Sequence, residues 1–344
     1  MPRQRFSFIS KKSAFPLLLL FVVCCCIFFT GCRHTSKAPK SVTGFYYDTI
    51  ISVTIYDSSS DQILSQCMDL ANHYEKLLSP NIEGSDIWNI NHNPNSYVTV
   101  SEDTLSLIST ALSYARLSDG LVDPTVGSLS QLWNFGSDNA AVIPDQNEIK
   151  TALSHINYES VHIKENQVML SDPSACMELG FIAKGFIADK IKEFLLSKGV
   201  TSAIINLGGN VLTVGSKPDG TPFSIGIQKP FEKNGVPALT LSINDASVVS
   251  SGSYERYFKQ DNILYHHILS TQTGYPVDSG LSQVTIISTS SVTGDALSTL
   301  CFILGYEKAV SLLKSYPDVQ AVFIAEDGQI SYINFDQSTL LSQH

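Results

Sequence analysis

The second half of this 344-residue chain constrains the fold most, because it alternates short apolar runs with glycine and proline turns. Residues 203–211 form an apolar run interrupted by the pair Gly208-Gly209. Further strands are predicted at residues 211–214, 223–227, 239–243, 247–249, 319–325 and 330–333. Helical patterns are interspersed among these runs. We therefore expect an α+β fold with mixed or largely antiparallel sheets and flanking helices.

The first half adds a strand at residues 49–56 and two amphipathic helices. Residues 61–78 carry apolar side chains at helical spacing. Residues 102–117 form a second predicted helix, for which Ser101 is the expected N-cap. A further helix is expected at residues 306–315. No solenoid-type internal repeat is found, and we predict one folded domain over residues 43–344.

The N-terminus is typical of an export signal. Basic residues precede an apolar run at residues 15–29, which is short for a membrane span. The run ends in Phe29-Thr30-Gly31-Cys32, which resembles a bacterial lipobox. We predict a signal peptide at residues 1–31, lipidation of Cys32 and a polar tether at residues 32–42, which would hold the protein on the outer, periplasmic or extracellular face of a membrane. A signal peptide without lipidation and a single membrane anchor are the alternatives.

Charge and cysteine content exclude some functions. The formal net charge of −10 argues against nucleic acid as a partner, since phosphates need a basic surface. A phosphorylated ligand would have to be held locally by a metal, backbone N–H groups or a few lysines. Outside the signal and Cys32 only Cys67, Cys176 and Cys301 remain, without zinc-site spacing or an even number for disulfides.

A candidate site lies between residues 265 and 299. His266 and His267 end an apolar run, and Asp295 and Thr299 are four residues apart on a predicted helix. Positions i and i+4 share a helix face, so both oxygens can point at one Mg²⁺ ion. In the simpler interpretation Asp295 begins the helix, Thr299 packs, and the histidines are ordinary half-buried side chains.

Two other segments suit a phosphorylated ligand. Residues 178–186 contain Gly180, Lys184 and Gly185 at a helix start, where free N–H groups can cradle phosphate. The spacing is not that of a P-loop, and many helices begin with such residues. Residues 118–127 are rich in Gly, Asp and Pro, which is typical of a rigid functional loop or of a structural turn.

In order, these segments resemble the FAD:protein FMN transferase (ApbE-like) family, over residues 45–305. The matching motifs are Leu78-Ser79 with Ser85 and Asn91, Asp123-Pro124-Thr125-Val126-Gly127 with Trp133-Asn134-Phe135-Gly136, Leu179-Gly180-Phe181-Ile182-Ala183-Lys184-Gly185, Asn206-Leu207-Gly208-Gly209-Asn210, Ser251-Gly252-Ser253-Tyr254-Glu255-Arg256, His267-Ile268 with Thr273-Gly274-Tyr275-Pro276, and Asp295-Ala296-Leu297-Ser298-Thr299. Each motif alone is weak, but seven in one order are specific.

The resemblance implies an ApbE-like, T-fold-related architecture and chemistry at the FAD pyrophosphate. It implies that the FMN part of FAD is transferred to a Ser/Thr hydroxyl with release of AMP. The implied acceptors are subunits of membrane redox complexes and other exported flavoproteins. The implied site residues are the Mg²⁺ ligands Asp295, Thr299 and the carbonyl of Phe181, the flavin-contacting Glu178, Lys184, Leu121, Val122 and Asp123, and the general base His267.

The chain departs from the family in two places. Ser270-Thr271-Gln272 stands where Asp-Pro-Arg is common, and Tyr47-Asp48 stands where Met-Gly is common. The first change affects the surroundings of His267 or the adenosine contacts, and the second would put a tyrosine beside the flavin ring. Two alternatives to transfer therefore stay open, hydrolysis of FAD to FMN and AMP, and FAD binding without chemistry.

Overall fold

A computed structural model describes residues 38–57, 60–135, 142–233 and 235–344, with Met1 and Gln4 alone before them. The predicted signal peptide, Cys32 and most of the tether lie outside these residues, as does Gly136 of one motif. In the part that is described, no helix is long and apolar enough to cross a membrane.

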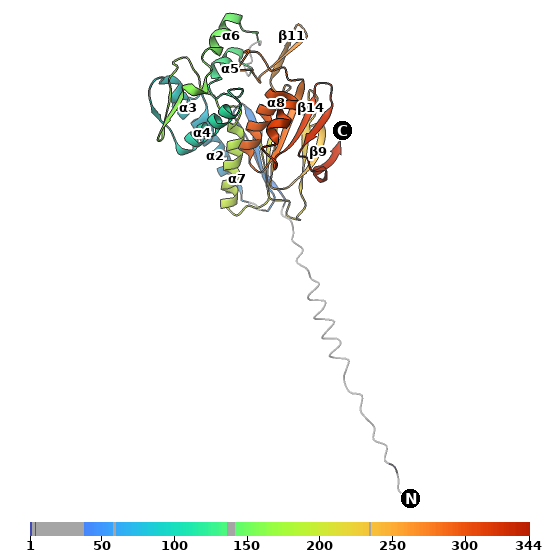
Figure 1. Ribbon diagram of the computed structural model, residues 1–344. Coiled ribbons are helices and arrows are strands. Elements are labelled where there is room, and N and C mark those ends of the chain that lie inside the picture. The colour runs from blue at the N-terminus through green and yellow to red at the C-terminus, as the bar shows by residue number, and fades with distance from the viewer. Residues whose placement is uncertain (2–3, 5–37, 58–59, 136–141, 234) are drawn as a thin grey trace. The chain divides into compact units, whose positions relative to one another are not determined.

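An eight-stranded antiparallel sheet forms the centre of the fold (Figure 1). Its strand order is β1-β2-β6-β7-β10-β13-β14-β15. The strands are β1 (Lys40–Tyr46), β2 (Thr49–Ile55), β6 (Ala203–Leu207), β7 (Asn210–Val214), β10 (Ser247–Gly252), β13 (Leu281–Ser288), β14 (Gln320–Ala325) and β15 (Ile330–Ile333). Central β13 is buried along its whole length, because both faces of the sheet are covered there.

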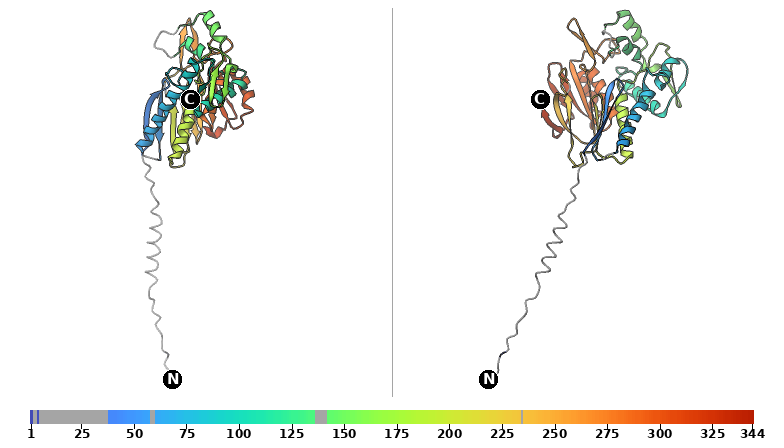
Figure 2. Two further views of the ribbon diagram at one scale, coloured as in Figure 1. Left: turned by 90° about the vertical axis from the view of Figure 1, so that its left-hand side faces the viewer. Right: turned by 180° about the vertical axis from the view of Figure 1, so that it is seen from behind.

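Three small antiparallel sheets surround the large one. Their strands are β16 (Leu340–Gln343), β9 (Pro237–Ile243) and β8 (Phe223–Gln228) in the first, β3 (Val98–Thr99), β5 (Gln167–Leu170) and β4 (Val161–Lys164) in the second, and β11 (Tyr257–Gln260) and β12 (Ile263–His266) in the third. The hairpin β11–β12 projects at the same end of the fold as α5 and α6 (Figure 2).

Helices cover one face of the large sheet. Those that pack most closely on its strands are α2 (Asp61–Leu78), α7 (Ala183–Ser197) and α8 (Ser291–Leu313). The other helices are α3 (Asp86–His92), α4 (Glu102–Leu117), α5 (Gly127–Trp133) and α6 (Gln146–Leu153), with 3-10 turns η1 (Tyr158–Ser160) and η2 (Gln337–Thr339). Strand alternation sends Ile51, Val53 and Ile55 into a core with α2 and α7. On the opposite face, β8 and β9 pack against β10, β13 and β14.

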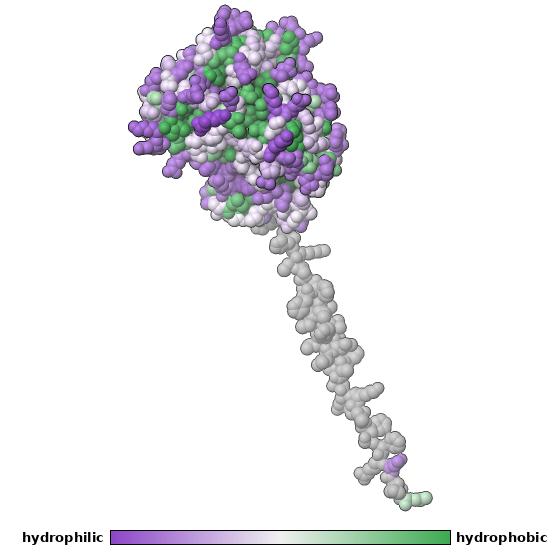
Figure 3. Space-filling model, viewed as in Figure 1, coloured by the Kyte–Doolittle hydropathy of each residue, from purple (hydrophilic) through white to green (hydrophobic). Residues whose placement is uncertain are grey.

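The expected α+β class with largely antiparallel sheets is confirmed, and the start of the fold differs from the prediction. Lys40, assigned to the tether, begins β1 because it pairs with Ile55 of β2. The helix expected at residues 306–315 is present as the second of two helices that together make up α8. The two helices meet at a kink at Gly305, where the backbone is non-helical with φ of 72°. The face drawn in Figure 3 is mostly polar, with apolar side chains gathered in several separate areas.

Candidate active site

The starts of α7 and α8 are packed so closely that only glycine fits at position 185. A Cβ added to Gly185 would lie 2.3 Å from the carbonyl oxygen of Ser291. Asp189, one turn further along α7, accepts hydrogen bonds from the backbone N–H groups of Ser291 (2.9 Å) and Val292 (3.0 Å). The first turn of α8 is therefore capped by α7, which fixes the direction of the side chains that follow.

Asp295 lies on α8 directly against this contact. Its side chain is buried, and Oδ2 accepts a 2.8 Å hydrogen bond from the N–H group of Gly185. Oδ1 is 3.8 Å from Nζ of Lys184. Burial raises the pKa of Asp295, while Lys184 and the Gly185 bond oppose that rise. The predicted proximity of Lys184 and Asp295 is confirmed. A second cation beside the buried carboxylate would compensate its charge further.

Two further oxygens suit a metal ion. The N–H group of Gly185, in the first turn of α7, has no partner within the helix and donates to Asp295. Phe181 precedes the helix, so its carbonyl is not part of the helical hydrogen-bond ladder. Thr299, one turn beyond Asp295, shares a 3.0 Å hydrogen bond with the hydroxyl of Ser251. A carboxylate, a hydroxyl and a carbonyl form an oxygen set that suits Mg²⁺. No cluster of three or more His, Cys, Asp and Glu able to hold a metal occurs among the described residues.

His267 follows β12 and faces the same charged groups. Its Nδ1 atom is buried and has no hydrogen-bond partner within the described chain. Burial, with the nearby positive charges of His266, Arg256 and Lys184, lowers the pKa of His267 to about 3. The imidazole is therefore neutral at physiological pH and able to accept a proton. His266 differs, because its Nε2 contacts the carbonyl of Val277 at 3.0 Å and its Nδ1 accepts from Ile268.

Glu255 belongs to this cluster but was not singled out by the sequence analysis. Desolvation by the surrounding protein raises its pKa, Lys184 and Arg256 oppose the rise, and Asp295 adds to it. A Cβ on Gly209 would lie 3.9 Å from the Glu255 carboxylate, which places the Gly208-Gly209 turn beside it. The sequence motif at residues 251–256 contains Glu255. However, an acidic residue next to an arginine is common in proteins, so this pair alone does not indicate a functional residue.

The loop predicted to contact flavin is held by Asp123, whose two carboxylate oxygens are both engaged. Oδ1 accepts from the N–H (2.8 Å) and hydroxyl (2.6 Å) groups of Thr125, and Oδ2 accepts from the N–H group of Tyr158 (2.8 Å). Burial raises the pKa of Asp123, and these bonds oppose it. Asp123 thus positions the loop, and the groups left to meet a ligand are Leu121 and the backbone around the buried Val122.

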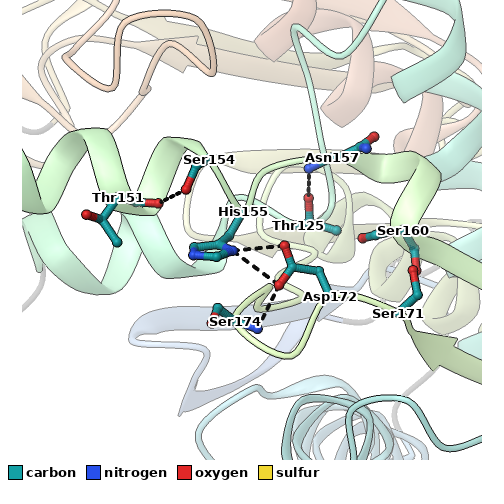
Figure 4. Close-up of polar contacts among 9 residues, drawn as sticks. All are labelled: Thr125, Thr151, Ser154, His155, Asn157, Ser160, Ser171, Asp172 and Ser174. Carbon is teal, nitrogen blue, oxygen red and sulfur yellow. Dashed lines mark hydrogen bonds and ion pairs between the residues drawn. The ribbon is translucent and has the colours of Figure 1, made fainter.

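Figure 4 shows polar contacts of this loop and of the residues near it. Thr125 Oγ1 accepts a 2.9 Å hydrogen bond from the N–H group of Asn157. His155 Nδ1 lies 2.9 Å from Oδ2 of Asp172, and Oδ1 of Asp172 accepts from the N–H group of Ser174 at 2.8 Å. Although desolvation acts in the opposite direction, the bonds from His155 and Ser174 lower the pKa of Asp172. The bond between Thr125 and Asn157 joins the loop to the segment that follows α6.

Glu178 connects the loop to the start of α7. Its N–H group donates to the carbonyl of Pro124 at 2.8 Å. Its carboxylate lies over Gly180, where an added Cβ would come within 2.7 Å of it. The structure therefore brings Glu178, the loop and the segment leading to Lys184 side by side.

Ser270-Thr271-Gln272, which departs from the family pattern, lies against the loop of residues 118–127. Ser270 Oγ accepts from the N–H groups of Gln272 and Thr273, both at 3.2 Å, which is a turn-capping role that an aspartate also performs. The hydroxyl of Thr271 donates to the carbonyl of Gly120 at 2.7 Å. A cavity of about 450 Å³ lies between Leu121 and residues 270–273. The turn that follows His267 is thus retained without the acidic residue.

The second departure is accommodated in the core. Tyr47 and Asp48 both have φ of 54° in the turn between β1 and β2. The hydroxyl of Tyr47 is buried without a partner among the described residues. Burial raises the pKa of Tyr47, with smaller effects from Glu75 and Tyr74.

Comparison with known proteins shows a fold shared with flavin transferases. The ApbE protein from Thermotoga maritima superposes with a TM-score of 0.78 at 32% identity, covering 85% of this chain and 96% of that structure. The flavin transferase ApbE from Vibrio cholerae gives a TM-score of 0.77 at 24% identity, covering 87% and 97%.

Sequence relatives give the same result. The FAD:protein FMN transferase of Treponema pallidum is 36% identical over 283 residues, 78% of each chain. The FAD:protein FMN transferase of Klebsiella pneumoniae strain 342 is 38% identical over 276 residues, 79% of this chain and 85% of the relative. A model of the ApbE family matches residues 47–323. The chain belongs to the ApbE family.

Proposed function

We propose that this chain transfers the FMN part of FAD to a Ser/Thr hydroxyl of an exported or membrane-bound acceptor protein and releases AMP. The observation that carries the proposal is the meeting of Lys184 with the buried Asp295 at the start of two interlocked helices. His267 is close enough to Lys184 for that positive charge to lower its pKa. The family membership and the relatives named FAD:protein FMN transferases support it.

The reaction follows from these groups. The acceptor oxygen attacks the phosphorus on the FMN side of the FAD pyrophosphate and forms a new P–O ester bond. The bond from that phosphorus to the bridging oxygen breaks, and the bridging oxygen leaves as part of AMP. The proton of the acceptor hydroxyl passes to a ring nitrogen of His267. Lys184 places a positive charge beside the phosphates, where negative charge increases during the reaction.

Mg²⁺ fits the oxygen set described above, so Asp295, Thr299 and the carbonyl of Phe181 would hold it. When bound, the ion neutralises charge on the pyrophosphate and stabilises the charge that develops at phosphorus. Glu178, Lys184, Leu121 and the backbone at residues 122–123 would contact the flavin nucleotide. FAD itself is the substrate in this proposal.

Bound FAD would make His267 a stronger base than it is in the free protein. With a pKa near 3, the imidazole is a weak base in the free protein. A pyrophosphate bound beside it brings negative charge, which raises the pKa of a nearby histidine. The base therefore becomes stronger only when FAD is in place.

The export signal and lipidation of Cys32 belong to the same proposal and rest on the sequence alone. They would place the enzyme on the outer face of a membrane, where acceptor subunits of membrane redox complexes and other exported flavoproteins are found. A lipid chain with this polar tether leaves the folded domain free to reach them.

The test uses purified protein, FAD, MgCl₂ and a panel of exported flavoprotein domains. Intact-mass analysis should show an acceptor that gains one FMN ester, and His267→Ala should lower the rate about a hundredfold or more. AMP release at full rate without an acceptor would indicate hydrolysis instead. FAD that stays bound and uncleaved would indicate a flavin-binding protein.

A further inference from the structure

Three half-exposed aromatic rings form a patch next to the active site, which we define as the aromatic patch of Phe231, Tyr254 and Tyr257. The Phe231 ring lies 6.2 Å from Tyr254 and 5.5 Å from Tyr257, in edge-to-face arrangements. Phe231 is 47% exposed and Tyr257 is 43% exposed. Unlike a single exposed ring, a contiguous group of exposed rings is a surface against which another molecule can pack.

The loop that presents Phe231 is built to hold it in place. Phe231 has φ of 61°, a left-handed conformation that is unfavourable for a bulky side chain. The side chain of Gln228 stabilises the loop by donating to the carbonyls of Lys229 (3.1 Å), Glu232 (3.3 Å) and Lys233 (3.0 Å), and by accepting from Gly235 (2.9 Å). The hydrogen bonds of Gln228 thus hold the backbone that presents the exposed ring, in spite of its unfavourable conformation.

The β11–β12 hairpin, which carries Tyr257, packs against the rest of the fold through one of its faces. Phe258 and Tyr265, on its opposite face, pack against Trp133 with ring centroids 6.5 and 5.8 Å away. In the described part of the chain β11 and β12 pair only with each other. Their outer edges therefore offer backbone groups to which an extended peptide can add as a strand.

The patch continues directly into the catalytic groups. Tyr254 precedes Glu255 and Arg256, whose charges act on Lys184 and His267. Tyr257 pairs with His266, so His267 follows at the base of the same hairpin. A polypeptide that delivers a hydroxyl to His267 would pass along this surface on its way into the site.

We propose that the aromatic patch and the free edge of the β11–β12 hairpin bind an extended segment of the acceptor protein, with an apolar side chain next to the modified Ser/Thr seated between Phe231 and Tyr257. This inference rests on the proposed transferase function and adds the part of the enzyme that recognises the acceptor. Basic Lys229, Lys233 and Lys259 alternate with acidic Glu232 and Asp261 around the rings. Since neither sign dominates, apolar contact is the main attraction.

The experiment compares Phe231→Ser and Tyr257→Ser with wild type, using full-length detergent-solubilised protein and the acceptor domain that wild type labels best. We expect the acceptor KM to rise about tenfold, as for the loss of an interface hot spot. FAD affinity and kcat at saturating acceptor should stay within about twofold. Tyr97→Ser is the matched control, because Tyr97 is 42% exposed and has Lys164 6.0 Å from its ring, as Lys259 is from Phe231.

A photoreactive phenylalanine at position 257 should cross-link to the acceptor segment beside the modified residue, whereas the same group at position 97 should not. The inference is overturned by an unchanged acceptor KM in both patch variants, by FAD affinity that falls in parallel, or by a change of oligomeric state that shows a second copy on the patch. If wild type labels no acceptor at all, the proposed function fails as well.

Discussion

The isolation of His267 is the residue-level feature with the widest consequences. A histidine whose ring nitrogen is buried without a partner reduces stability when it is protonated, so the folded protein favours the neutral ring. The neighbouring His266 has the ordinary arrangement, with both nitrogens engaged. Two adjacent histidines thus have separate roles, one that supports the backbone after β12 and one that is free to react.

A pH dependence of stability follows from the shifted pKa of His267. Its pKa falls from the ordinary 6.5 in the unfolded chain to about 3 in the folded protein. Between these values the unfolded state binds more protons, so the stability from the neutral ring is present above pH 6.5 and is lost as the pH falls toward 3. Denaturant unfolding at several pH values should show a shallower acid dependence for His267→Gln. An equal slope in wild type and variant would contradict the assignment.

The pKa of Asp295 is raised, in contrast to that of His267, and this predicts how loss of its charge affects stability. Its raised pKa means that the buried carboxylate reduces stability at neutral pH when no metal compensates its charge. Asp295→Asn should keep or raise the melting temperature without metal, lose the stabilisation by MgCl₂ and lower transfer about a hundredfold or more. Asp145→Asn, at the exposed N-cap of α6, is the control. A variant that MgCl₂ still stabilises would place the metal elsewhere.

The sequence predicted which residues gather at the site better than what each one does there. Lys184 and Asp295 meet as expected, because two helix starts with recognisable motifs carry them. Asp123 was expected to contact flavin, and the structure adds a second role, because its oxygens accept hydrogen bonds from Thr125 and Tyr158 that hold the loop. The Tyr158 contact spans 35 positions in the chain, and no local pattern shows it. The cap that Asp189 forms on α8 was missed for the same reason, since its partners lie about a hundred residues later.

At the level of elements, the contact between α7 and α8 places the reactive groups. Gly185→Ala would put a Cβ 2.3 Å from the Ser291 carbonyl oxygen, and both atoms belong to rigid helix starts. We expect a loss of about 3 kcal/mol of stability, a typical cost of overpacking, together with loss of activity as Lys184 moves away from Asp295.

Thermal unfolding and the transfer rate test this change against a control glycine. Gly226→Ala places its Cβ 3.4 Å from Pro237, an ordinary contact, and should leave both measurements nearly unchanged. Wild-type stability and activity in Gly185→Ala would show that the two helices adjust easily, and that their spacing does not set the site.

The elements themselves were largely predictable, because hydrophobic periodicity decides them. Apolar alternation in β2 and the amphipathic pattern of α2 both lead to burial of the expected face. The start of β1 at Lys40 could not be predicted, since a polar edge strand has almost the same composition as a tether. Pairing with β2, rather than local propensity, makes it a strand.

At the scale of the whole molecule, the proposed catalytic residues and the predicted lipid anchor lie in separate parts of the chain. The region from Ala38 to His344 is a compact unit of its own, and it carries every proposed catalytic and flavin-binding residue. The acidic surface expected from a net charge of −10 gives no general attraction for phosphate, so the local groups around Lys184 must supply it. The predicted lipid anchor would then affect where the enzyme acts and leave its chemistry unchanged.

Substitution of Cys32 tests this separation. Cys32→Ser should move the protein from the membrane fraction to the soluble fraction after export, because no thiol remains for the lipid, whereas Cys26→Ser within the apolar run should stay on the membrane. Transfer to a soluble acceptor domain should be the same for wild type and Cys32→Ser. Labelling of a membrane-bound acceptor should fall, because an enzyme confined to the same membrane meets it at a higher effective concentration. A Cys32→Ser protein that remains in the membrane fraction would show that the apolar run itself is the anchor.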